Sequence, residues 1–92
     1  MIACRESVTI VNQRGLHARA SAKFVNMVGE LPPSCNVLVS KDGIEAAGAS
    51  ILGLMMLGAG KGDTVEITVS GEGAETALEQ LVALVRDGFG ED

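Results

Sequence analysis

The chain has 92 residues, 47% of them hydrophobic and 21% charged, with a net charge of −5 at pH 7. This length allows one small domain over residues 1–92, and the apolar content excludes an intrinsically disordered chain. The acidic balance argues against nucleic acid and an anionic membrane surface as partners, because both require a basic face. With two aromatic residues, the core must be mainly aliphatic.

The apolar pattern predicts seven elements in the order β-α-β-β-α-β-α. Alternation predicts a strand over 6–11, and spacing of three and four predicts a helix over 18–28. A second strand alternates from residue 35 to residue 39, and Asp42-Gly43 favours a hairpin turn into a third strand over 44–47. A short helix over 51–57, a strand around 65–69 and a helix over 74–85 complete an α+β domain of two layers.

The two cysteines, Cys4 and Cys35, lack metal-site spacing, and we expect reduced, buried thiols. No signal-peptide pattern precedes them, and the most apolar stretch, 51–60, is shorter than the ~20 residues that span a bilayer. These features predict a soluble protein of the cytoplasm.

The single histidine, His17, lies just before the first predicted helix. The unpaired N–H groups of a helix N-terminus favour phosphate, and Arg14, Arg19 and Lys23 add positive charge nearby. Gly15 allows a tight loop that exposes the ring. Imidazole is a nucleophile near neutral pH, so His17 is a candidate phosphoryl acceptor. The alternative is a histidine that only caps or packs.

Ser50 precedes the short helix and has the character of an ordinary N-cap. This helix is apolar nearly all round, which predicts an exposed Leu/Met patch suited to docking. The alternative is that the whole helix belongs to the core.

Two motifs resemble signatures of the HPr phosphocarrier family. Residues 12–20, NQRGLHARA, resemble its phosphohistidine motif, and residues 50–58, SILGLMMLG, are similar to the signature that begins at its regulatory serine. The resemblance covers nearly the whole chain. Ala20 and Ala49 stand where many sugar-system members have proline and lysine, so the chain looks more like the nitrogen-related branch.

The resemblance implies an open-faced β-sandwich with a four-stranded antiparallel sheet and three helices on one face. It implies that enzyme I phosphorylates His17 on its δ1 nitrogen and that an enzyme IIA domain receives the phosphoryl group. Arg19 would then steady that group beside Ala18, and HPr kinase/phosphorylase would modify Ser50. The implied partner-binding residues are Ala18, Ala20, Ile51, Leu52, Leu54 and Met55.

We therefore expect a monomeric phosphocarrier without metal or organic cofactor, acting within a phosphotransferase system rather than as a stand-alone enzyme. The alternative function is a regulatory binding protein whose Ser50 phosphorylation state selects its partners. A third class, a small RNA-binding α+β domain, conflicts with the acidic charge and the scarcity of aromatic residues.

Overall fold

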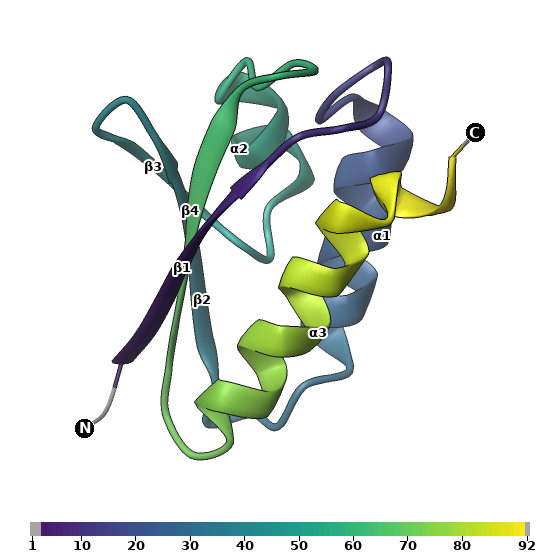
Figure 1. Ribbon diagram of the computed structural model, residues 1–92. Helices are drawn as coiled ribbons and strands as arrows, with labels where there is room; N and C mark the ends of the chain where they lie inside the picture. The colour runs from purple at the N-terminus through teal and green to yellow at the C-terminus, as the bar shows by residue number, and fades with distance from the viewer. Residues whose placement is uncertain (1–2, 92) are drawn as a thin grey trace.

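The computed structural model describes residues 3–91. Its elements follow the predicted order and end in a short 3₁₀ turn, η1 (Figure 1). The bounds are β1 Ala3–Thr9, α1 Ala18–Gly29, β2 Asn36–Lys41, β3 Ile44–Ala47, α2 Ile51–Met56, β4 Thr64–Ser70, α3 Ala74–Arg86 and η1 Gly88–Gly90.

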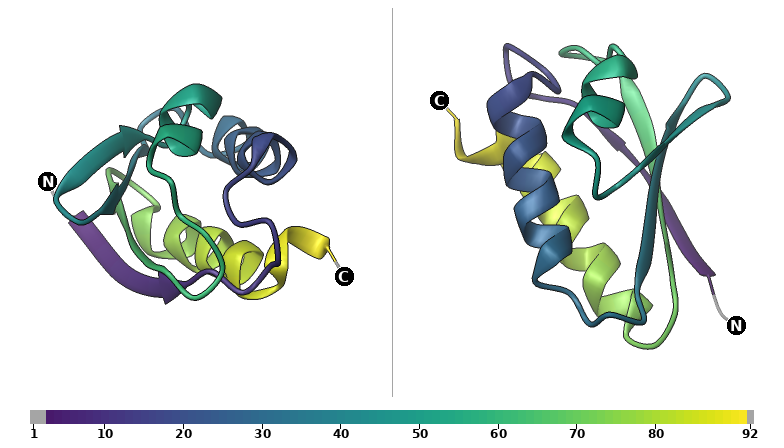
Figure 2. Two further views of the ribbon diagram at one scale, coloured as in Figure 1. Left: turned by 90° about the horizontal axis from the view of Figure 1, so that it is seen from above. Right: turned by 180° about the vertical axis from the view of Figure 1, so that it is seen from behind.

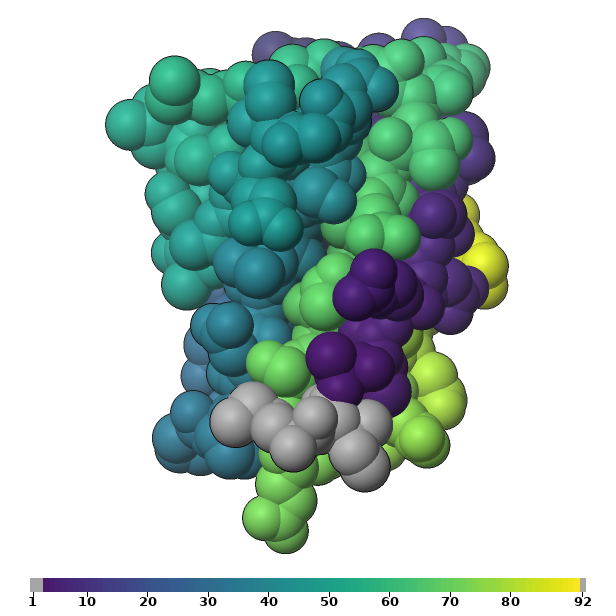
Figure 3. All heavy atoms as spheres, turned by 90° about the vertical axis from the view of Figure 1, so that its left-hand side faces the viewer, coloured from purple at the N-terminus to yellow at the C-terminus, as the bar shows by residue number. Residues whose placement is uncertain are grey.

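The four strands form one antiparallel sheet in the order β1-β4-β2-β3. β4 is therefore central and pairs with β1 on one side and β2 on the other. The three helices lie on one face of this sheet, as the two further views in Figure 2 show. Figure 3 looks onto the other face, where β1, β4 and β2 run side by side without a covering helix. The predicted open-faced α+β architecture is confirmed.

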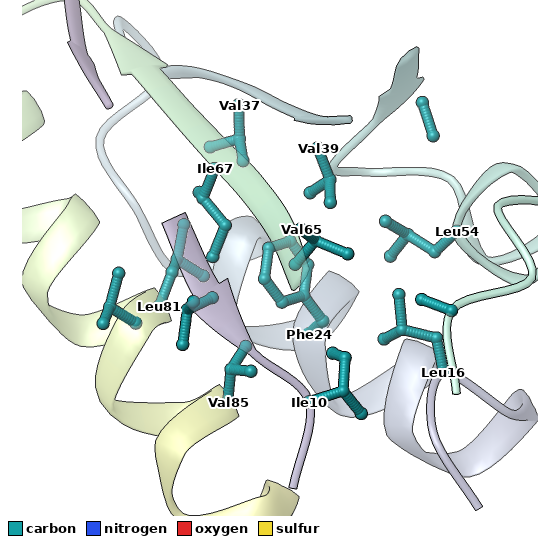
Figure 4. Packing of buried hydrophobic residues seen from close by; sticks show 14 of the residues in the cluster. Ile10, Leu16, Phe24, Val37, Val39, Leu54, Val65, Ile67, Leu81 and Val85 are labelled. Carbon is teal, nitrogen blue, oxygen red and sulfur yellow. The ribbon is translucent and has the colours of Figure 1, made fainter. Parts of the chain in front are cut away.

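The core lies between the sheet and the helices (Figure 4). Alternate residues of β4 point into it, so Val65, Ile67 and Val69 are almost completely buried. Phe24 of α1 and Leu81 of α3 pack against them from the helical layer. Burial of one apolar face on each element holds the two layers together.

The hairpin between β2 and β3 forms where Asp42-Gly43 predicts it. Lys41 pairs directly with Ile44, which leaves a loop of two residues. Both loop residues have positive φ, +52° at Asp42 and +82° at Gly43. This conformation suits the right-handed twist of the flanking strands and favours Asp-Gly.

The main differences from the predictions lie at element ends. The first strand is Ala3–Thr9 instead of 6–11, because Ile10 bonds to the loop at Gly62 and Asp63 rather than continuing the ladder. The prediction also missed η1, which follows α3. Cys4 and Cys35 are free thiols but only half-buried, which corrects the expectation of buried ones. Within the described chain, every helix is too short or too polar to cross a bilayer.

Candidate functional site

His17 is the N-cap of α1. Its backbone is extended, and its Nδ1 accepts a hydrogen bond of 3.3 Å from the backbone N–H of Arg19. The ring is half-buried, with 16% of the side chain exposed. The first turn of a helix has N–H groups without helical partners. Nδ1 therefore lies where an anion bound to it would meet those groups.

Gly15 shapes the loop that delivers His17. It has φ +63°, and a Cβ added there would lie 2.3 Å from the carbonyl oxygen of Ala59. That same oxygen accepts a hydrogen bond of 2.9 Å from the N–H of Leu16. The close approach of the two loops requires a glycine, and it fixes the backbone immediately before His17.

The other ring nitrogen of His17 contacts Glu91, which follows η1. Nε2 lies 2.6 Å from Oε2 of Glu91, and the two residues are 74 positions apart in the sequence. Because a backbone N–H can only donate, Nδ1 must be unprotonated to accept it. The proton of the neutral ring is therefore on Nε2, which donates to the carboxylate.

Asn12 connects the loop to the same carboxylate. Its Nδ2 donates to Oε1 of Glu91 at 3.0 Å and to the carbonyl of Gly15 at 2.9 Å. Both partners are acceptors, which fixes the orientation of the amide. The hydrogen bond from Asn12 is the largest of the effects that lower the pKa of Glu91. Burial raises this pKa in part, and the interactions with His17 and Lys23 lower it further. Glu91 is therefore a carboxylate at neutral pH.

The predicted cationic residues are placed unequally. Arg14 and Arg19 are exposed, and within residues 3–91 their guanidinium groups form no ion pair. Lys23 instead donates a hydrogen bond of 2.7 Å to the carbonyl of Phe89 in η1. The two arginines remain available to a ligand, whereas Lys23 holds the segment after α3 against α1.

Ser50 is the N-cap of α2, as predicted. Its Oγ accepts a hydrogen bond of 2.9 Å from the N–H of Gly53, and the residue is half-buried. The sequence also predicts modification of this hydroxyl. Ser50 is partly exposed to solvent, as such a modification requires.

Four of the six large apolar residues exposed in the described chain lie on α2. Ile51, Leu52, Met55 and Met56 are exposed by 41%, 67%, 39% and 74%. Leu54 has no exposed surface, because it points from the same helix into the core (Figure 4). α2 is thus neither wholly core nor wholly exposed.

Two of the predicted partner-binding residues need correction. Leu54 and Ala20 each have 0% of their surface exposed. Helical periodicity turns Leu54 inward from α2 and Ala20 inward from α1, so neither side chain is presented to a partner. Ala18 is exposed beside His17. Ile51, Leu52 and Met55 remain on the surface, and Met56, which was not predicted, is more exposed than any of them.

Sequence reasoning missed Glu91 as part of the site. No periodic pattern or motif joins it to His17, because the contact depends on how α3 and η1 pack. The one available signal is Phe89, an aromatic residue between two glycines beyond the last predicted helix. Phe89 is 1% exposed and anchors this segment in the core. In the described part of the chain, no group of three His, Cys, Asp or Glu side chains is placed to hold a metal ion.

The open-faced sheet and the histidine at the start of α1 define a small domain of the histidine phosphocarrier class. Residues 4–87 match the family model described as the PTS HPr component phosphorylation site. The chain belongs to the HPr family of phosphocarrier proteins of the phosphotransferase system.

Individual relatives agree with this assignment. The chain is 44% identical to the phosphocarrier protein HPr of Pseudomonas aeruginosa, over 91% of this chain and 92% of that protein. It is 36% identical to the phosphocarrier protein NPr of Shewanella violacea, over 99% and 98%, which fits the nitrogen-related branch. The crystal structure of HPr from Thermoanaerobacter tengcongensis is similar, with a TM-score of 0.89 and 35% identity over 97% and 98% of the two chains.

Proposed function

We propose that this chain accepts a phosphoryl group on Nδ1 of His17 from phospho-enzyme I and passes it to an enzyme IIA domain. The observation that carries the proposal is the hydrogen bond that Nδ1 accepts from the N–H of Arg19 at the start of α1, which requires a lone pair on Nδ1. In the reaction, the Nδ1 lone pair gives up its hydrogen bond from the N–H of Arg19 and forms the bond to phosphorus. The bond between phosphorus and the donor breaks, and its electron pair stays with the donor.

The surroundings of Nδ1 support both acceptance and release. The phosphoryl oxygens would accept hydrogen bonds from the first-turn N–H groups at Ala18 and Arg19, where the helix dipole also favours negative charge. The exposed guanidinium of Arg19 is free to form charge-assisted hydrogen bonds with the same oxygens. Ala18 and Arg19 beside the ring are exposed, which leaves room for a second protein to take the group away.

The test is intact-mass measurement after incubation with enzyme I and phosphoenolpyruvate. We expect the mass of one phosphoryl group, labile in acid, on the wild-type chain and none on His17→Ala. An unchanged wild-type mass with a competent enzyme I would overturn the proposal, as would labelling that persists in the variant. Chase with an enzyme IIA domain then tests onward transfer.

We further propose that phosphorylation of Ser50 by an HPr kinase/phosphorylase regulates docking. The supporting observation is the apolar surface formed by Ile51, Leu52, Met55 and Met56, which begins one residue after Ser50. This surface equally supports the alternative function, a regulatory protein whose Ser50 state selects its partners. We also propose that the chain works in the cytoplasm, a reducing compartment in which the free thiols Cys4 and Cys35 would persist. We further propose that it acts as a monomer.

A further inference from the structure

We infer that Glu91 is a positioning residue for phosphoryl transfer at His17. The contact of 2.6 Å between its carboxylate and Nε2 holds the ring with its proton on Nε2 and its lone pair on Nδ1. This inference rests on the proposed function, because it concerns how the same histidine is prepared for reaction.

A carboxylate is the group best suited to this position. Glu91 faces two donors at once, since Oε1 accepts from Nδ2 of Asn12 and Oε2 accepts from Nε2 of His17. The orientation of Asn12 is fixed independently by the carbonyl of Gly15. A glutamine at residue 91 has one oxygen for two donors, so its NH₂ would face either Asn12 or Nε2. Facing Nε2, it would favour the tautomer with the proton on Nδ1, which cannot attack phosphorus.

The charge of Glu91 also favours the reaction itself. When Nδ1 bonds to phosphorus, the neutral ring keeps the Nε2 proton and gains a single positive charge. A carboxylate hydrogen-bonded to that Nε2–H stabilises this charge, by the same physics as the aspartate that orients the histidine of a serine-hydrolase triad. The ring that later releases the phosphoryl group therefore stays protonated on Nε2.

The fold holds Glu91 in place by neighbouring contacts. Phe89 is buried in the core, and its carbonyl accepts a hydrogen bond of 2.7 Å from Lys23 of α1. The N–H of Glu91 donates to the carbonyl of Gly88 at 3.0 Å. Both the side chain of Phe89 and its backbone are thus fixed two residues before the carboxylate. Glu91 itself is 18% exposed in its side chain, so water screens its contact with His17 only in part.

The experiment compares Glu91→Gln with Glu79→Gln in the full chain. Glu79 is an exposed residue of α3 whose side chain makes no hydrogen bond within residues 3–91, and it carries the same charge change. The first readout is the initial rate of His17 phosphorylation by phospho-enzyme I. The second is the ¹⁵N spectrum of the imidazole, which reports the nitrogen that carries the proton and which a merely structural role would not move. The thermal midpoint shows that both variants fold.

We expect Glu91→Gln to slow phosphorylation about tenfold or more, since losing the carboxylate partner of a metal-ligating histidine costs about 10–100-fold and the triad aspartate costs more. Its ring nitrogens should shift toward the Nδ1–H form, and Glu79→Gln should match the wild type in both readouts. A Glu91→Gln chain that folds, keeps the wild-type ring spectrum and is phosphorylated at the wild-type rate overturns the role of Glu91 alone. A wild-type chain that takes no phosphoryl group on His17 overturns the proposed function, and this inference with it.

Discussion

His17 is an unusual N-cap, because serine, threonine, aspartate and asparagine are the residues preferred at that position. Its Nδ1 accepts the capping hydrogen bond from the N–H of Arg19. In the preferred residues, the oxygen of a shorter side chain accepts this bond. Removal of the ring in His17→Ala therefore costs cap stability, about 0.5–2 kcal/mol, besides the proposed nucleophile. His17→Asn retains a capping oxygen and is the better inactive variant for binding experiments.

At the same scale, Arg19→Ala is expected to slow phosphoryl transfer without unfolding the protein. The side chain is exposed, so little packing is lost. Charge-assisted hydrogen bonds are worth about 1.5–3 kcal/mol, which corresponds to a loss of roughly ten- to a hundredfold in rate. Quench-flow measurement with phospho-enzyme I checks this expectation, and a wild-type rate would show that the guanidinium takes no part.

Gly15→Ala is expected to destabilise the fold. A Cβ there meets the oxygen of Ala59 at 2.3 Å, and φ is +63°. Left-handed backbone alone costs a non-glycine residue about 1–2 kcal/mol, so we expect a loss of about 2 kcal/mol or more in the free energy of unfolding. Gly29→Ala is the matched control, because nothing lies within 4 Å of its added Cβ. Equal urea midpoints for the two variants would contradict the close approach of the loops.

At the scale of elements, variants of Ser50 can test its role in capping α2 separately from its role in docking. Ser50→Asp keeps a good N-cap, so the thermal midpoint should change little. The added charge stands beside Ile51 and must be desolvated when an apolar partner surface docks, so we expect slower phosphorylation of His17 by enzyme I.

Ser50→Asn is the control for that variant, because it caps equally well without a charge. We expect its phosphorylation rate to stay close to that of the wild type. If both variants are phosphorylated as fast as the wild type, Ser50 is an ordinary cap. A drop of several degrees in the midpoint of Ser50→Asp would indicate that the charge disturbs α2 itself.

Sequence periodicity predicts the elements well where one face is buried, and less well elsewhere. Val65, Ile67 and Val69 alternate in the sequence because helices cover only one face of β4, and the structure places all three in the core. Leu54 shows the limit of this reasoning, since an apolar residue among apolar neighbours gives no sign of which side faces inward. Glu91 could not be assigned at all, because its partner is 74 residues away and local pattern carries no record of tertiary contacts.

At the scale of the whole molecule, the sheet order keeps the two cysteines apart. Cys4 lies in β1 and Cys35 precedes β2, with β4 between these strands. Two strand spacings separate them by about 10 Å, beyond the roughly 7 Å limit for Cα atoms of a disulfide. We expect two titratable thiols per chain after mild oxidation under native conditions. A monomer that loses both thiols together would show that the sheet opens.

The position of β4 also bears on how a newly made chain acquires its site. β1 and α1 are synthesised before β4, the strand that pairs with β1, which spans Thr64–Ser70. The carboxylate beside His17 comes later still, at residue 91. An incomplete nascent chain can form a stretch of helix but has no central strand on which α1 can pack. The imidazole of a chain made only as far as β3 is therefore left without its final surroundings, which are complete once residue 91 has been added.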